Sequence, residues 1–237
     1  MRHLACIKLL ELAIFIWSVL CYDRINLEKE VILVEHKRIL TLTQGALIAA
    51  LAYVGFQFLR IDIPVGAERT AIHLGNTMVV LGALLLGGWG GFAGALGLTL
   101  ADLTSGYVTT APKTFILKLI IGLVTLAISR KLFHIEKEPS MKSQARIALF
   151  SSIAALGLNV VLDPLFGYFY KTYLFGIPQD LSAALAKISS VTTLVNAAAS
   201  TVAVVILWPA LFRALAGTDR LPWQSTVTDD RDPVQAV

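Results

Sequence analysis

Cysteine is almost absent from this chain of 237 residues. Its two cysteines, Cys6 and Cys21, both lie near the amino terminus, so the rest of the sequence has no thiol for a disulfide, a metal site or nucleophilic chemistry. His73 has no second histidine, cysteine or carboxylate at ligand spacing beside it, which makes it a weak metal candidate. We therefore expect no metal site and no resident cofactor.

Charged residues are also scarce. They make up 15% of the chain, against 56% hydrophobic residues, whereas about a quarter of the residues of a soluble domain are charged. The mean hydropathy of +0.72 agrees, and the composition predicts an integral membrane protein. A net charge of +4 would suggest nucleic acid in a soluble protein, but in a membrane protein the basic excess follows from topology. We expect no nucleic-acid partner.

Several catalytic motifs are missing from the sequence. It contains no GxxxxGK[ST] phosphate loop, so transport driven by ATP would need another chain to hydrolyse the nucleotide. It contains no HExxH or GxSxG motif, and Asp102 with Asp163 alone would be a thin basis for intramembrane proteolysis. These absences favour a protein that is not an enzyme.

Apolar runs close to membrane-spanning length recur along the chain, although the second and third are short. They cover about residues 39–59, 71–86, 88–104, 112–130, 145–164 and 184–212. The pattern predicts an all-α membrane protein, a bundle of six transmembrane helices. Three loops on one side would then comprise residues 60–70, 104–112 and 165–183.

Lysine and arginine are distributed unevenly between the two sides of this predicted bundle. One side collects Lys37, Arg38, Arg130, Lys131, Lys137, Lys142, Arg146, Arg213 and Arg220, and the other has Arg60, Arg69, Lys113 and Lys171. The positive-inside rule places the first group, and with it both ends of the core, in the cytoplasm. The three loops would then face outward.

The predicted domain organisation has three parts. Residues 1–36 contain an apolar stretch that carries Lys8 and Glu11 and barely reaches spanning length, so we interpret them as an accessory segment, either an upstream extension, a signal anchor or an interfacial helix. Residues 37–214 form the membrane domain. Residues 215–237 are a polar cytoplasmic tail that we expect to be disordered.

Small residues form a stripe in the first span and crowd the second and third. Ala46 and Ala50 are four residues apart, a spacing that allows another helix to pack closely, either within the bundle or from a partner protein. Glycines around the sequence LGGWGG also repeat at GxxxG spacing. We interpret these glycines mainly as packing residues.

Polar and ionisable residues inside the predicted spans are costly and therefore require a reason. Asp102 ends the third span, and Thr114 and Lys118 share a face of the fourth, so Asp102 and Lys118 could form an ion pair, contact a ligand, or both. His73 and Asn76 fall on one side of the second span if its helix has already begun there.

The last two spans carry further polar positions. Asn159 and Asp163 are one turn apart and precede Pro164, which should end or kink the helix. The sixth span has a polar stripe of Ser189, Thr193, Asn196 and Ser200. Aromatic residues fill the third loop, LFGYFYKTYLFG, as an interfacial girdle or as a wall that stacks on a flat ring, with Tyr107 as another candidate for such stacking.

The stretch IHLGNTMVVLGALLLGGWGGFAGALGLTLADLTSGYVTTAPKTFILKLI resembles the substrate-capture subunit, or S component, of energy-coupling-factor (ECF) vitamin transporters. The resemblance extends over residues 38–213 and is strongest to the branch with riboflavin, hydroxymethylpyrimidine and pyridoxine subunits. Its most specific parts are the glycine-rich run, ADLTSGY and PKTFILK. The Ala46 and Ala50 stripe resembles the motif by which such subunits dock on the transmembrane coupling subunit.

The resemblance implies a multi-pass subunit of a prokaryotic cell membrane that takes up its vitamin from outside. It would work with a coupling protein and two ATP-binding subunits in the lipid bilayer. By position, the family's pocket maps onto Asn76, Asp102, Tyr107, Thr114, Lys118, Asn159, Asp163 and Asn196.

The residues alone leave other functions open. A self-sufficient secondary transporter of a small organic solute remains an alternative, although no inverted repeat is evident, and a membrane enzyme is a further one. The vitamin also stays open, since one basic and two acidic groups with nearby aromatics suit pyridoxine, a hydroxymethylpyrimidine or a flavin. A carboxylated substrate would use Lys118 as its counter-ion.

Overall fold

The structure is a computed structural model that describes residues 35, 37–65, 68–138, 140–215. The accessory segment, apart from Glu35, and the predicted tail beyond residue 215 lie outside this range. The chain divides into two compact units, residues 1–42 and 43–237. All elements described below, from Thr43 onward, belong to the second unit.

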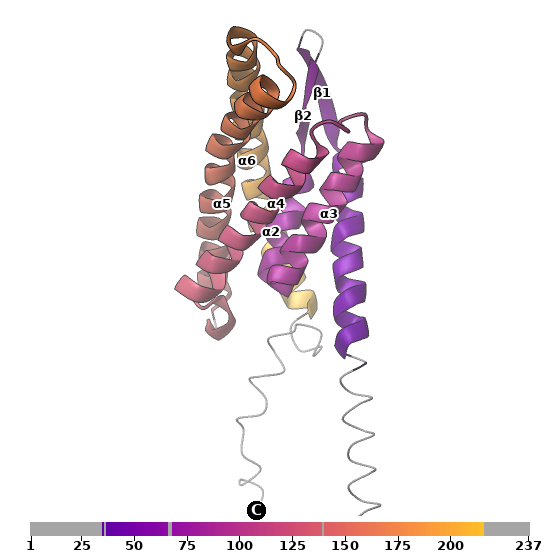
Figure 1. The fold of residues 1–237 in the computed structure, drawn as a ribbon. Helices are drawn as coiled ribbons and strands as arrows, with labels where there is room; N and C mark the ends of the chain where they lie inside the picture. Colours follow the sequence, from indigo (N-terminus) through magenta and orange to yellow (C-terminus); the bar gives the residue numbers. More distant parts are fainter. Residues whose placement is uncertain (1–34, 36, 66–67, 139, 216–237) are drawn as a thin grey trace, which may run out of the picture. The chain divides into compact units, whose positions relative to one another are not determined.

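The second unit is mainly helical (Figure 1). A first helix, Lys37–Phe58, contributes its residues from Thr43 onward to this unit. The further helices are α2 (Gly75–Leu86), α3 (Gly88–Thr104), α4 (Ala111–Leu126), α5 (Met141–Phe169) and α6 (Gln179–Leu215). Within the described residues four helices are long and apolar enough to cross a membrane, namely Lys37–Phe58, Ala111–Leu132, Met141–Leu174 and Gln179–Ala214. The chain is therefore an all-helical membrane protein in its main architecture, with α2 and α3 shorter.

A β-hairpin lies between the first helix and α2, where the sequence analysis predicted only a loop and the beginning of a helix. Strand β1 (Arg60–Val65) pairs antiparallel with β2 (Glu68–His73), and Ile61 faces Ile72. The sequence RIDIPV alternates apolar and polar residues, which is the period of a strand. The second helix consequently starts at Gly75, and His73 lies at the end of a strand.

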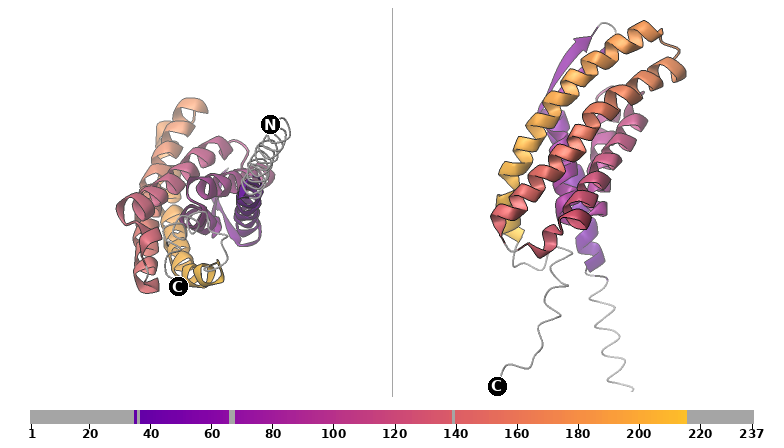
Figure 2. Two further views of the ribbon diagram at one scale, coloured as in Figure 1. Left: turned by 90° about the horizontal axis from the view of Figure 1, so that it is seen from below. Right: turned by 90° about the vertical axis from the view of Figure 1, so that its left-hand side faces the viewer.

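Helix α5 is longer than predicted. It continues through Pro164 to Phe169, and a π-helical turn extends it to Leu174. Pro164 therefore does not end the helix, and the predicted span of residues 145–164 was too short. A kink at Pro164, the other alternative, stays a prediction. Most of the predicted aromatic loop is helix. Only a short connection separates this turn from α6, and Figures 1 and 2 show it at the same end of the bundle as the hairpin.

Glycines allow the helices to approach backbone to backbone. A Cβ at Gly82 would lie 2.6 Å from the carbonyl oxygen of Gly90, and a Cβ at Gly91 would lie 3.0 Å from the Cα of Gly122. These pairs mark the α2–α3 and α3–α4 crossings, so the packing interpretation of the glycine-rich run is confirmed. The turn between α2 and α3 uses Gly87 at φ 69°, a conformation that favours glycine.

Gly97 provides a test of this packing. A Cβ there would meet the main chain of Ala49, with 2.8 Å to its carbonyl carbon, whereas a Cβ at Gly157 would meet nothing within 4 Å. We expect Gly97→Ala to lower the free energy of unfolding by about 1–3 kcal/mol, since the two backbones must separate. Gly157→Ala should leave the free energy of unfolding unchanged or raise it by up to about 1 kcal/mol. Thermal unfolding in detergent checks both, and equal melting temperatures would contradict the packing.

Candidate functional site

A polar cavity opens between the hairpin and helices α2, α3, α4, α5 and α6. Its volume is about 150 Å³, comparable to a cavity that holds one benzene ring. All eight residues predicted to bind substrate line it: Asn76, Asp102, Tyr107, Thr114, Lys118, Asn159, Asp163 and Asn196. The structure therefore brings these residues together, and ligand contact by each of them stays a prediction.

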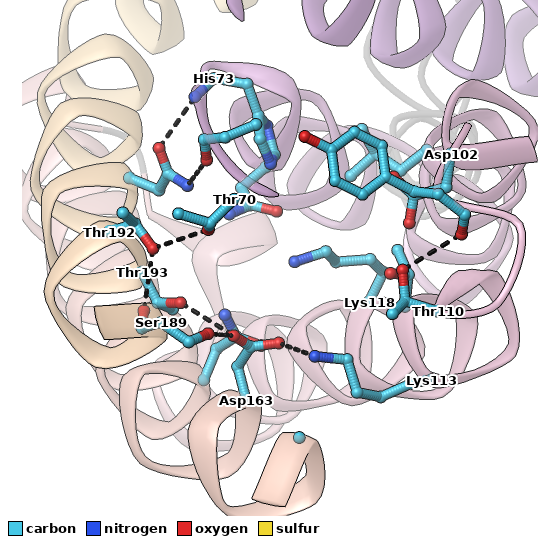
Figure 3. A pocket seen from close by; sticks show the side chains of 18 of the residues that line it. Thr70, His73, Asp102, Thr110, Lys113, Lys118, Asp163, Ser189, Thr192 and Thr193 are labelled. Atoms are coloured by element: carbon cyan, nitrogen blue, oxygen red, sulfur yellow. Dashed lines mark hydrogen bonds and ion pairs between the residues drawn. The ribbon is translucent and has the colours of Figure 1, made fainter. Parts of the chain in front are cut away.

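Asp163 is the centre of a hydrogen-bonded cluster that joins three helices. One carboxylate oxygen accepts from the Lys113 ammonium at 2.8 Å. The other accepts from the hydroxyls of Ser189 at 2.8 Å and Thr193 at 2.9 Å. These contacts connect α4, α5 and α6 (Figure 3), so the Asp163 carboxylate is already engaged by its own chain.

Asn196 attaches the hairpin to α6. Its amide nitrogen donates to the carbonyl of Ala71 at 3.0 Å, and its amide oxygen accepts from the backbone N–H of His73 at 2.9 Å. A second contact joins the hydroxyls of Thr70 and Thr192 at 3.0 Å. Both ends of the Asn196 amide are thus paired with strand β2. The helix periodicity of α6 alone does not predict this pairing.

The attachment predicts a large difference between two neighbouring polar residues of α6. Asn196→Ala should lower the free energy of unfolding by about 1–3 kcal/mol, because it leaves a buried N–H and a carbonyl unpaired. It should also speed amide exchange in residues 70–73. Ser200→Ala, one turn further along, should have little effect, since the Ser200 hydroxyl has no partner among the described residues. Thermal unfolding and hydrogen exchange check this, and similar behaviour of the two variants would contradict the attachment.

His73 enters the cavity wall as a neutral imidazole. Its Nδ1 accepts from the backbone N–H of Gly75 at 3.2 Å, so the ring proton lies on Nε2. The ring centroid is 4.6 Å from that of Phe56. Burial, with the positive charge of Lys118 adding to it, lowers the pKa of His73 to about 3. At neutral pH the imidazole therefore contributes no charge to the site.

Asp102 and Lys118 face the same cavity but do not form the ion pair that the sequence suggested. Their residues are 5% and 8% exposed. The polar neighbour of the Asp102 carboxylate is the Thr114 hydroxyl. Within the described part of the chain, the Lys118 ammonium has no ion-pair or hydrogen-bond partner, and Figure 3 shows its nitrogen pointing toward the middle of the cavity. Both charged side chains therefore line one cavity without an ion pair between them.

Two further amides line the cavity. Asn76 is 2% exposed and Asn159 is 3% exposed, and neither amide oxygen has a hydrogen-bond partner among the described residues. A buried amide without its partners carries a substantial free-energy cost. In contrast with Asn196, these two side chains keep hydrogen-bonding capacity at the cavity wall.

Tyr107 lies at the rim. Its hydroxyl donates to Asp62 of β1 at 3.0 Å, and the Arg60 guanidinium lies 6.0 Å from the centre of its ring. The aromatic stretch of residues 166–175 contributes only Gly167 and Lys171 to the cavity lining. The hypothesis that its rings form a wall of the site therefore has no support from the lining, whereas Tyr107 is a wall residue.

The sequence analysis missed several lining residues. Lys113 entered it only as an external charge, and Thr70, Thr110 and Thr192 were not named, although all four line the cavity. The position of Lys113, five residues before Lys118 on the same helix, could have indicated that it also lies near the cavity, because a buried lysine needs a counter-charge. No group of three or more histidine, cysteine or acidic residues that could hold a metal ion occurs in the residues that the structure describes.

A bundle of apolar helices with a charged cavity near one end defines a membrane-embedded solute-binding protein. Comparison with known proteins gives the family. Residues 36–213 match the family model described as ECF-type riboflavin transporter, S component, and the chain belongs to this family. Its members are substrate-binding subunits of transporters.

A solved structure gives independent support for the fold. It is described as "Structure and mechanism of the S component of a bacterial ECF transporter", and it aligns with 74% of this chain and 97% of its own length. The TM-score is 0.52 and the sequence identity is 16%, so the likeness concerns the fold. The search of curated proteins found no match.

Proposed function

We propose that this chain captures a small vitamin or vitamin precursor with a heterocyclic ring outside the cell and delivers it through an ECF module. The partners would be a transmembrane coupling subunit and two ATP-binding subunits. The observation that carries the proposal is the cavity, in which uncommitted polar groups of Asn76, Lys118 and Asn159 surround a space of ring size. Such groups are the usual means of orienting a ligand in an enclosed site.

The topology follows the same proposal. Six spans with both core ends in the cytoplasm place the hairpin and the cavity on the outer side. The basic residues Arg130, Lys131 and Lys137 lie around the end of α4, at the end of the bundle away from the hairpin (Figure 1), as the positive-inside rule expects for a cytoplasmic end. An outward-facing cavity suits capture of a scarce solute.

The size of the cavity bears on the substrate. A volume of about 150 Å³ accommodates one ring with small substituents, so pyridoxine or a hydroxymethylpyrimidine fits more readily than the three fused rings of riboflavin. The family description nevertheless includes riboflavin. We therefore keep riboflavin as the third candidate and give the single-ring compounds first place.

The decisive experiment combines ligand identification with reconstitution. Protein purified in detergent is analysed by mass spectrometry for retained small molecules. Proteoliposomes then contain the chain with or without an ECF module, and uptake of labelled pyridoxine, hydroxymethylpyrimidine and riboflavin is measured. We expect uptake that requires both ATP and the module. Uptake by the chain alone, driven by an ion gradient, would instead support a secondary transporter.

A further inference from the structure

The charges of the cavity are not equivalent. Asp163 has Lys113 and two hydroxyls as partners, so this acid and this base satisfy each other. Asp102 and Lys118 remain, both buried, both in the cavity wall, and not joined by an ion pair within the described structure. Oppositely charged side chains in a bundle interior would normally pair. A ligand in the cavity would lie against both charged side chains.

The chemistry of the missing contacts defines that group. A carboxylate accepts hydrogen bonds and favours a donor or a positive charge, whereas an ammonium group donates and favours an acceptor or a negative charge. Asn76 and Asn159 add amide groups at the wall. A uniformly apolar ring would leave the Lys118 ammonium and the two amide oxygens without partners and would leave Asp102 with the Thr114 hydroxyl alone. A simple anion would satisfy Lys118 while facing Asp102.

We propose that the ligand is a small dipolar ring, with a hydrogen-bond donor or cationic ring nitrogen directed to Asp102 and an acceptor or anionic oxygen directed to Lys118. The inference rests on the proposed function and specifies its substrate class. A hydroxypyridine has this character, because its ring nitrogen can carry a proton while its hydroxyl is deprotonated. An aminopyrimidine meets the same requirement with its amino group and a ring nitrogen.

Binding measurements with purified full-length protein in detergent test the two poles separately. The probes are pyridoxine and 4-amino-5-hydroxymethyl-2-methylpyrimidine. Asp102→Asn and Lys118→Met should each weaken binding of at least one probe about 10- to 100-fold, the loss expected for a hydrogen bond to a charged group. Asp180→Asn and Lys187→Met remove an exposed acid and an exposed lysine of α6 and should leave binding unchanged.

An analogue distinguishes direct contact from a structural effect. If Lys118 contacts the 3-hydroxyl oxygen of pyridoxine, 3-deoxypyridoxine should bind wild-type protein more weakly than pyridoxine does, and Lys118→Met should not weaken its binding further. The comparison of the two ligands on wild-type protein needs no variant, so it can be made even if a substitution prevents folding. Lys118→Arg, which keeps the charge and moves it, gives a second test and should bind pyridoxine more weakly than wild type.

The outcomes separate the inference from the proposed function. Wild-type affinity in both Asp102→Asn and Lys118→Met would overturn the inference, as would tight binding of inorganic phosphate alone, while ATP-dependent uptake would still support the function. Preference for riboflavin that is insensitive to both substitutions would overturn it as well. A folded wild-type protein that retains no small molecule and supports no uptake with the ECF module would instead refute the proposed function.

Discussion

Tryptophan at Ala46 or Ala50 is expected to abolish uptake and to leave ligand binding unchanged. Both alanines are exposed, whereas Gly45 and Ile48 on the same helix are buried. Gly45 packs on Trp89, and Ala49 packs on Gly97, so contacts within the bundle use a different face. A bulky side chain at an exposed small-residue stripe would prevent close approach of a partner helix. The measurements are ligand binding in detergent and ATP-dependent uptake with the ECF module.

Ile153→Trp on α5 is the matched control. Ile153 is also exposed, at 52%, and lies on a helix opposite the first one in Figure 1, so the added bulk should leave both activities near wild type. Uptake by Ala46→Trp and Ala50→Trp at the wild-type rate would show that the stripe faces lipid only. Loss of ligand binding in either variant would show damage to the fold instead.

Removal of the Asp163 carboxylate should be the most destabilising single change in the site. Asp163→Leu leaves the Lys113 ammonium, whose side chain is 12% exposed, with no counter-ion and leaves two hydroxyls without their acceptor. Breaking one partner of a buried ion pair costs about 3–5 kcal/mol. We expect a corresponding fall in the free energy of unfolding, measured by thermal and chemical unfolding in detergent, while Asp180→Asn on the surface should behave as wild type.

A double variant separates the loss of charge balance from the loss of shape. Lys113→Met combined with Asp163→Leu removes the unpaired ammonium and should be more stable than Asp163→Leu alone, because two apolar side chains replace the pair. If the double variant is less stable than Asp163→Leu, the Lys113 contact does not account for the effect. The Ser189 and Thr193 hydrogen bonds would then carry most of it.

The polar residues of the site could be predicted from the sequence because of where they lie. Asn76, Asp102, Lys118 and Asn159 occur in apolar runs, and the cost of burying such groups in a membrane marks each as structural or functional. Their depth along each helix also follows from the sequence. Their direction around the helix axis depends on the packing of all helices, so the sequence left open whether Asp102 and Lys118 pair with each other or contact a ligand, and the structure shows both in one cavity wall without an ion pair between them.

The roles of similar residues could not be separated from the sequence. Three asparagines, Asn76, Asn159 and Asn196, lie in similar surroundings. Only Asn196 uses both its amide nitrogen and its amide oxygen in hydrogen bonds to strand β2. The role of Asn196 depends on the hairpin, and the sequence had predicted a loop and the beginning of a helix in its place. Alternation in RIDIPV was a signal for a strand, but six residues beside a long apolar run are ambiguous between the two periods.

The backbone contacts between α2 and α3 bear on how the proposed site can adapt to ligands of different size. Gly82 meets the carbonyl group of Gly90, and Gly94 meets the main chain of Val79, so the contact between the two helices includes backbone atoms, which have no rotamers to change. We therefore expect Asn76, at the start of α2, and Asp102, near the end of α3, to keep a constant separation. In the proposed site, we expect ligands of different length to be accommodated by α5 and α6 rather than by α4, because Gly91 and Gly122 join α3 to α4 through their backbones in the same way.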